Sequence, residues 1–274
     1  MKKAILYVLL FVAIQVVVMN VVEGVCLLIG STAVVVDKTT QMIIGLSAAN
    51  VLAFVVFLWK RMTPLSPSWL LTRPWSVLLW TALASIGMAI PFTWLQEHLP
   101  ELPNLIEMEM GNLMANYWGY VVVGLLAPLV EEVVFRGAVL RVLLEKLTPW
   151  KAIVVSALLF SLVHGNPAQM PYAFIGGLLL GWMYWRTGSI IPGMVYHWVN
   201  NSAAYIVSNM YQQADVKLVD IFGSEQHALM AAGFSLMIVI PALWQLYLQM
   251  KRADSQDCCR PVGQHRRQAV RTTE

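Results

Sequence analysis

Charged side chains are scarce in this chain: Asp, Glu, Lys and Arg together make up only 12% of its 274 residues. Soluble domains carry about 25% charged and about 45–50% apolar residues, whereas 58% of this chain is hydrophobic. Cysteine is rare as well, and the spacing of the three cysteines suggests neither a zinc site nor a disulfide framework. The composition therefore excludes an ordinary soluble domain and favours an integral membrane protein.

Long apolar runs are what the chain has in place of charge. The first run is long enough to cross a membrane and shows no clear signal-peptide cleavage site, so we expect an uncleaved first helix. The sequence predicts an all-α, polytopic membrane protein with about eight transmembrane helices, each of about 20 mainly apolar residues. The predicted spans are 4–29, 41–59, 75–95, 116–147, 150–164, 171–186, 189–208 and 228–250.

Much of the net charge of +3 lies after Met250. A basic segment just past a membrane helix is typical of a cytoplasmic anchor, which we favour over nucleic-acid binding. We therefore expect residues 1–252 to form one transmembrane helical domain and residues 253–274 to form a basic, disordered cytoplasmic tail. The basic residues after Met250 are Lys251, Arg252, Arg260, Arg266, Arg267 and Arg271.

The remaining basic residues occupy alternate loops, and the loops between them carry acids such as Glu97, Glu101 and Asp220. The positive-inside rule places both termini in the cytoplasm, which agrees with an even number of spans. We expect the host membrane to be a bacterial inner membrane. The basic loop residues are Lys2, Lys3, Lys60, Arg61, Arg73, Arg141, Lys146, Lys151 and Arg186.

Two adjacent acids, Glu131 and Glu132, interrupt the fourth apolar span, and Arg136 follows them. An ionisable side chain at the centre of a membrane helix costs about 2.5 kcal/mol or more, so it indicates a functional site. Glu132 and Arg136 are four residues apart and can pair on one helix face. Glu131 points about 100° away and is left free to act as a general base. The alternative is one ion-pair cluster that holds helices together.

Two histidines and an amide follow on later spans. His164 ends the short fifth span, four residues after Phe160, and alone it would be an ordinary interfacial residue. His197 can share a helix face with Asn201, or meet Asn200, and alone this pattern is typical of interhelical hydrogen bonding. Together with a free glutamate they form a hydrolytic set. A carboxylate and an imidazole can deprotonate water, and an imidazole with an amide can stabilise an oxyanion.

The order Glu-Glu-x-x-x-Arg, Phe-x-x-x-His and His-x-x-x-Asn resembles the CAAX protease and bacteriocin-processing family, also called the Abi family, which includes the type II CAAX prenyl endopeptidases. The resemblance covers about residues 116–208, the expected catalytic core. It implies an eight-helix, CAAX-protease-like bundle that hydrolyses peptide bonds within the membrane.

The resemblance also implies roles for the residues. Glu131 and His164 would activate water, and His197 and Asn201 would form the oxyanion hole. The spacing favours Asn201 over Asn200 as the amide that faces the site. The supporting residues would be Glu132 and Arg136.

Members of this family are also classed as metalloproteases, so zinc is an alternative. If a metal is bound, Glu131, His164 and His197 would supply three ligands and leave one position open. The chain has no His-Glu-x-x-His motif, and a metal-free mechanism gives each residue a role. We therefore favour a mechanism without a metal cofactor.

The predicted function is that of an intramembrane endopeptidase acting on membrane-associated peptides or proteins. Its expected partners are membrane lipid and a peptide or protein substrate, with no nucleic acid. In a bacterial host, a peptide precursor or bacteriocin leader is favoured over a prenylated protein. The alternative is a non-catalytic membrane immunity or scaffold protein of the same fold. A transporter is disfavoured, because we find no internal repeat in the sequence.

Overall fold

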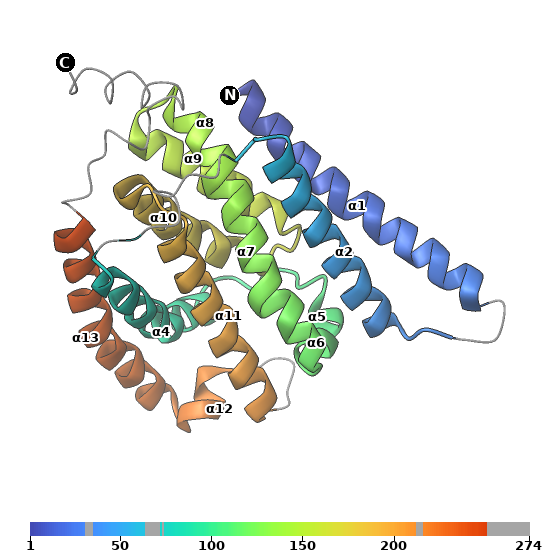
Figure 1. Ribbon diagram of the computed structural model, residues 1–274. Helices are drawn as coiled ribbons and strands as arrows, with labels where there is room; N and C mark the ends of the chain where they lie inside the picture. The colour runs from blue at the N-terminus through green and yellow to red at the C-terminus, as the bar shows by residue number, and fades with distance from the viewer. Residues whose placement is uncertain (31–34, 64–71, 73, 212–215, 251–274) are drawn as a thin grey trace, which may run out of the picture.

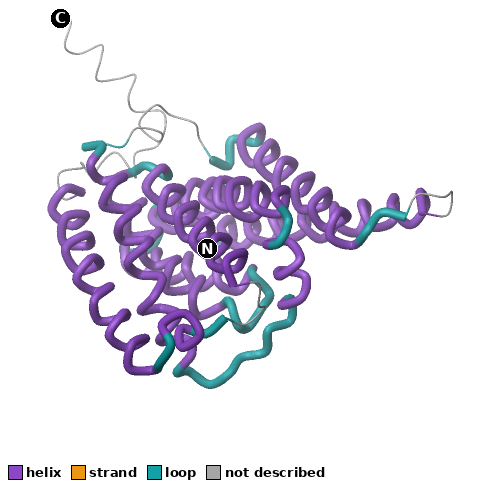
Figure 2. The backbone as a smooth tube through the Cα atoms, turned by 90° about the horizontal axis from the view of Figure 1, so that it is seen from below, coloured by secondary structure: helices purple, strands orange, loops and turns teal. Residues whose placement is uncertain are grey.

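Helices are the only regular elements in the part of the chain that the computed structural model describes, which is residues 1–30, 35–63, 72, 74–211 and 216–250 (Figures 1 and 2). This result confirms the predicted all-α class. A helix pairs its own backbone N–H and C=O groups, which lipid cannot do. The predicted tail 253–274 and the basic residues Arg73, Lys251 and Arg252 lie outside the described residues.

Each of the eight predicted spans coincides with a helix or a continuous helical stretch. One such stretch runs from Tyr117 to Leu144 and changes its helix type along its length. The elements are α1 (Lys2–Gly30), α2 (Lys38–Trp59), α4 (Ser76–Glu97), α5 (Glu107–Met114), α6 (Tyr117–Tyr120), η1 (Val121–Leu126), α7 (Ala127–Glu132), η2 (Val133–Leu140), α8 (Arg141–Leu144), α9 (Pro149–Val163), α10 (Met170–Thr187), α11 (Ile191–Tyr211), α12 (Leu218–Phe222) and α13 (Glu225–Met250).

Five of these stretches are long and apolar enough to cross a membrane: α1, α2, α4, the stretch from Tyr117 to Leu144, and α13. α9 is apolar but has only 15 residues. α10 and α11 are long enough but less apolar, and α11 carries His197 and the two asparagines. The chain is therefore a polytopic helical membrane protein, and the count of eight crossings stays a prediction.

The helices pack into a bundle in which the stretch 117–144 and α11 are central (Figure 1). α1 and α2 lie against each other and against η2 on one side, and α4 and α13 lie against each other on the opposite side. The far ends of α1 and α2 extend beyond the other helices (Figure 2). α7, which carries the glutamates, contacts both α2 and α11.

Two apolar clusters form the interior. The first joins α1, α2, η2 and α9 and includes Phe11, Phe57, Phe135 and Ile153. The second joins α4, α10 and α13. Large apolar side chains also cover the outer surface, especially on α1 and α13. An exposed apolar surface of this extent is what a lipid-facing helix presents.

One end of the bundle carries basic residues. Lys60 and Arg61 follow α2, and Arg141 on α8 donates a hydrogen bond to the Met62 carbonyl at 3.4 Å. The N-terminus lies at the same end (Figure 1). Glu109 of α5 lies with the start of α2, where Lys38 pairs with it at 2.9 Å; this hydrogen bond lowers the Glu109 pKa. The predicted orientation, with both termini cytoplasmic, stays a prediction.

Candidate active site

The glutamates lie in a short α-helical segment between two π-helical segments. α7 spans only Ala127–Glu132, with η1 before it and η2 after it. In η1 the N–H of Ala127 bonds to the carbonyl of Val122, five residues back. π-helical turns within a helix are rare and occur frequently at functional sites. The apolar run of this span gave no sign of them.

Glu132 and Arg136 form a buried ion pair, as their spacing predicts. Arg136 Nη1 donates to Glu132 Oε1 at 2.8 Å, and the two side chains are 1% and 0% exposed. The guanidinium also lies 4.5 Å from the centre of the Phe160 ring and donates to the Gly177 carbonyl at 3.4 Å. A buried ion pair needs such additional partners to offset the loss of hydration.

Glu131 has different surroundings from its neighbour. Its side chain is 20% exposed, but its Oε2 atom is buried and accepts no hydrogen bond in the described part of the chain. The nearest basic atom is His197 Nε2, at 3.7 Å. One carboxylate of the pair is thus neutralised by arginine and the other is not. Glu132 Oε2 is also buried without a donor among the described residues, so the arginine is what distinguishes the two acids.

His197 lies between the two carboxylates. Its Nε2 is 3.7 Å from Glu131 Oε2, and its Nδ1 is 3.5 Å from Glu132 Oε1. We expected Glu131 to act with His164, but the structure brings His197 to Glu131 instead. These contacts suit a catalytic acid–imidazole pair, and they equally suit the alternative of a structural charge cluster.

His164 follows α9 and is fixed by its own helix. Its Nδ1 lies 2.8 Å from the Phe160 carbonyl oxygen. A carbonyl can only accept a hydrogen bond, so Nδ1 carries the proton, and in the neutral ring Nε2 is an acceptor. Among the described residues, no hydrogen bond or ion pair joins His164 to Glu131. The ring of Phe160 packs edge-on against both histidines. Its centre lies 4.9 Å from the His164 ring centre and 5.9 Å from the His197 ring centre.

The two asparagines of α11 bond in different directions. Asn201 donates from Nδ2 to the Val123 carbonyl in η1 at 2.9 Å, so it faces the glutamate stretch. Asn200 accepts a hydrogen bond from the hydroxyl of Tyr172 on α10 and donates to Asn201 Oδ1 at 3.4 Å. Asn201 thus contacts η1, the segment that precedes the glutamates. Its choice as the oxyanion amide stays a prediction.

Hydrogen bonds from two other helices fix the position of α11. Ser85 on α4 donates to the carbonyl of Tyr196, the residue before His197, at 2.9 Å. On the other side Tyr120 accepts from Trp198 Nε1 at 3.2 Å and lies 3.0 Å from the Ser202 hydroxyl. Sequence patterns did not indicate these contacts, because they join residues far apart in the chain.

A metal ion would need several of these side chains to converge. Within the described residues, no group of three His, Cys, Asp or Glu side chains is placed to hold a metal ion. The expected set of Glu131, His164 and His197 therefore does not form a ligand group in this arrangement. Metal dependence stays open to measurement.

The fold and the site together define a helical membrane protein with acid, imidazole and amide groups inside its bundle. Residues 113–203 match the family model described as type II CAAX prenyl endopeptidase Rce1-like. This match supports membership of the CAAX protease family, which the motifs predict, and it points to a membrane protease. The matched segment includes all six predicted site residues. No curated protein and no solved structure matches the chain.

Proposed function

We propose that the protein is an intramembrane endopeptidase that hydrolyses peptide bonds of membrane-associated peptides or proteins. The observation that carries the proposal is the unpartnered Oε2 of Glu131, which lies 3.7 Å from His197 inside an apolar helical bundle. A buried carboxylate oxygen without a donor is costly, and it is what a general base for a bound water requires.

The proposed first step is the attack of water on the scissile carbonyl. Glu131 takes one proton of the water, and the Nε2 acceptor of His164 holds the other hydrogen and orients the molecule. The water oxygen bonds to the carbonyl carbon, and the electron pair of the C=O bond moves to its oxygen. Both roles follow from the free acceptor atoms of the two side chains.

The oxyanion formed in this step needs hydrogen-bond donors. Asn201 uses one N–H of its amide on the Val123 carbonyl, which leaves its second N–H for the oxyanion. His197 is the second donor in the proposal. Glu131 then passes its proton to the leaving nitrogen as the C–N bond breaks, which gives a carboxylic acid and an amine.

Glu132 and Arg136 are supporting residues in this proposal. Their ion pair neutralises one of two adjacent carboxylates, so Glu131 carries its charge beside a neutral pair. Without Arg136, the two neighbouring carboxylates would repel each other. No step is routed through a metal, because each residue has a role without one.

The bundle's apolar outer surface suggests a substrate that approaches within the lipid. We propose entry between the glutamate stretch, α9 and α11, the elements that carry the site. The substrate would be a membrane-anchored or amphipathic peptide, and the host a bacterial inner membrane.

The experiment uses the purified protein in lipid vesicles with a panel of membrane-anchored peptides, in H₂¹⁸O. We expect cleavage with one ¹⁸O in each new carboxyl terminus. The Asn201→Ala protein should lose about 10²–10³-fold in kcat, the range for one oxyanion donor, and His164→Ala should lose activity similarly. Metal content and the effect of a chelator are measured on the same samples. Full activity of His164→Ala, or a wild type that cleaves nothing yet functions in cells, would favour the scaffold alternative.

A further inference from the structure

We propose that Tyr172 is a positioning residue whose hydroxyl orients the Asn201 amide through Asn200. The inference rests on the proposed function, because it assigns Asn201 to the oxyanion. Tyr172 lies on α10, outside the motifs that indicate the family, and its ring makes no contact with the glutamates among the interactions that the described residues form.

An unbroken series of hydrogen bonds, all running in one direction, joins Tyr172 to η1. The Tyr172 hydroxyl donates to Asn200 Oδ1, Asn200 Nδ2 donates to Asn201 Oδ1 at 3.4 Å, and Asn201 Nδ2 donates to the Val123 carbonyl at 2.9 Å. An amide has a donor end and an acceptor end, so a fixed donor at one end of the series sets the orientation of both amides.

The acceptor at the far end of the series, the Val123 carbonyl, has no competing backbone donor in the π-helical register. In η1 the bond from Ala127 to Val122 spans five residues, and the next bond in this register would join residue 128 to Val123. Residue 128 is proline, which has no N–H to donate. The carbonyl of Val123 is therefore left to Asn201, and an Asn201 amide turned by 180° would place two acceptors against each other.

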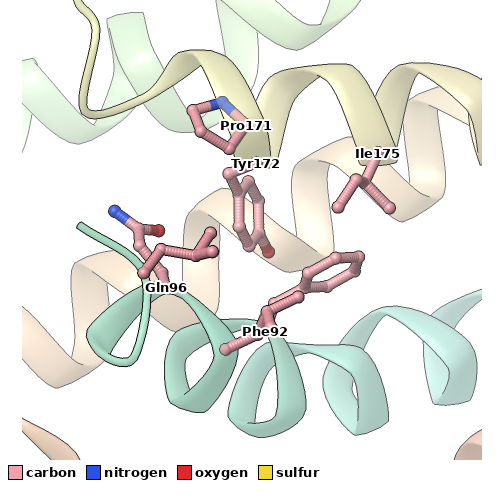
Figure 3. A pocket seen from close by; sticks show the side chains of 7 residues that line it. Phe92, Gln96, Pro171, Tyr172 and Ile175 are labelled. Atoms are coloured by element: carbon pink, nitrogen blue, oxygen red, sulfur yellow. The ribbon is translucent and has the colours of Figure 1, made fainter. Parts of the chain in front are cut away.

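The Tyr172 ring has a fixed position at the near end of the series. It packs edge-on against Phe92 of α4, with ring centres 5.3 Å apart. Both rings belong to the wall of a hollow of about 20 Å³ between α4 and α10 (Figure 3). The other lining residues are Leu95, Gln96, Leu99, Pro171 and Ile175. Contacts on both sides of the series thus hold it between α4 and η1.

The consequence for the site is a defined direction for the second N–H of Asn201. If Tyr172 loses its hydroxyl, Asn200 can rotate, and Asn201 loses the donor that holds its oxygen. Substrate binding in the ground state does not depend on this N–H, but the stabilisation of the oxyanion in the transition state does. The expected signature is a loss in kcat with KM unchanged, which a general loss of packing would not produce.

The test compares Tyr172→Phe with Tyr7→Phe, a matched loss of a hydroxyl from a partly buried ring in the first core cluster. Tyr172→Phe should lower kcat about tenfold, the effect of one hydrogen bond, with KM unchanged, and Tyr7→Phe should match the wild type. The double variant Tyr172→Phe/Asn200→Ala should be no slower than Asn200→Ala alone, because the tyrosine acts through that amide. Wild-type kcat in Tyr172→Phe, or additive losses in the double variant, overturns the inference.

A second readout does not depend on activity. With ¹⁵N-asparagine labelling in detergent, the Asn200 and Asn201 side-chain amide resonances are assigned by substitution. They should shift in Tyr172→Phe and stay unchanged in Tyr7→Phe. If the wild type cleaves no peptide, the proposed function fails by itself, and the amide spectrum still decides whether Tyr172 orients Asn201: an unchanged Asn201 resonance overturns the positioning claim.

Discussion

At the scale of single residues, two neighbouring glutamates have opposite surroundings. Glu132 is fully buried and its Oε1 accepts a hydrogen bond from Arg136, whereas Glu131 is partly exposed and has no arginine partner. Among the described residues, the Oε2 atom of each glutamate lacks a hydrogen-bond donor. The difference follows from helix geometry, since adjacent side chains point about 100° apart. A structural role for one acid and a chemical role for the other is the simplest consequence.

The buried pair predicts a large effect on stability. Arg136→Met leaves Glu132 buried without a counter-charge, so the free energy of unfolding in detergent should fall by about 3–5 kcal/mol. The double variant Glu132→Gln/Arg136→Met should recover part of this loss, because no charge is left unpaired. Lys38→Met, which breaks an exposed pair, is the control and should have little effect. Equal losses in Arg136→Met and Lys38→Met would contradict the account.

The space beside Glu132 predicts a second effect. A Cβ at Gly193 would lie 2.5 Å from Glu132 Oε2, whereas a Cβ at Gly176 would meet no atom within 4 Å. Gly193→Ala should therefore lower stability by about 1–3 kcal/mol, as overpacking does, and should lower activity by displacing the carboxylate that faces His197. Thermal unfolding and peptide cleavage check this against Gly176→Ala. An unchanged Gly193→Ala protein would show that Glu132 has room to move.

Single residues also show what the sequence can and cannot reveal. The Glu132–Arg136 pair follows from a spacing of four within one helix, so it was predictable. The partner of Glu131 was not, because the distance between α7 and α11 is set by tertiary packing. The roles of Tyr172, Tyr120 and Ser85 were hidden for the same reason, because each side chain bonds to a residue at least 28 positions away in the sequence.

At the scale of elements, the unusual feature is the change of helix type around α7. The positions of the helices were predictable from the lengths of the apolar runs. The π-helical segments were not, because a backbone hydrogen bond that reaches five residues back instead of four does not alter an apolar run. α10 and α11 have a lower hydropathy and are therefore not among the clear membrane spans. In α11 the lower hydropathy comes from the polar residues of the site itself.

Pro128 allows a test of the π-helical segment. Pro128→Ala restores a backbone N–H that competes with Asn201 for the Val123 carbonyl. We expect the stability to hold or rise and kcat to fall about tenfold, the effect of one weakened hydrogen bond. Pro241→Ala, also inside a membrane helix but on α13, is the control. Thermal unfolding and cleavage rates measure both. Full activity of Pro128→Ala would contradict this explanation. The Val123 carbonyl would then stay available to Asn201 even when residue 128 has an N–H.

At the scale of the whole molecule, charge is separated between the two ends of the bundle. Basic residues after α2 and around α8 lie at the end that holds the N-terminus, and the acids of α5 lie toward the other end (Figure 1). The positive-inside rule assigns the basic end to the cytoplasm. The sequence showed this separation, because loop charges can be counted without knowing how the helices pack.

Cysteine labelling tests the orientation. In a protein whose three native cysteines are replaced by alanine, Glu101→Cys should react with a membrane-impermeant maleimide in intact cells. Lys146→Cys should react only after the membrane is permeabilised, because it lies after α8 at the basic end. The labelled fraction at each site is the measurement, and the reverse pattern would place both termini outside the cytoplasm.

The central claim is that Glu131 is the base that activates water, and one pair of variants tests it most directly. Glu131→Gln keeps the shape of the side chain and removes its basicity, and Glu145→Gln makes the same change at an exposed glutamate after α8. The two proteins and the wild type are compared for kcat on one membrane-anchored peptide, after equal thermal unfolding shows that all three are folded. The account predicts a loss of about 10²–10⁴-fold for Glu131→Gln, the range for general acid–base catalysis, and wild-type turnover for Glu145→Gln. A Glu131→Gln protein that cleaves the peptide as fast as the wild type would contradict it.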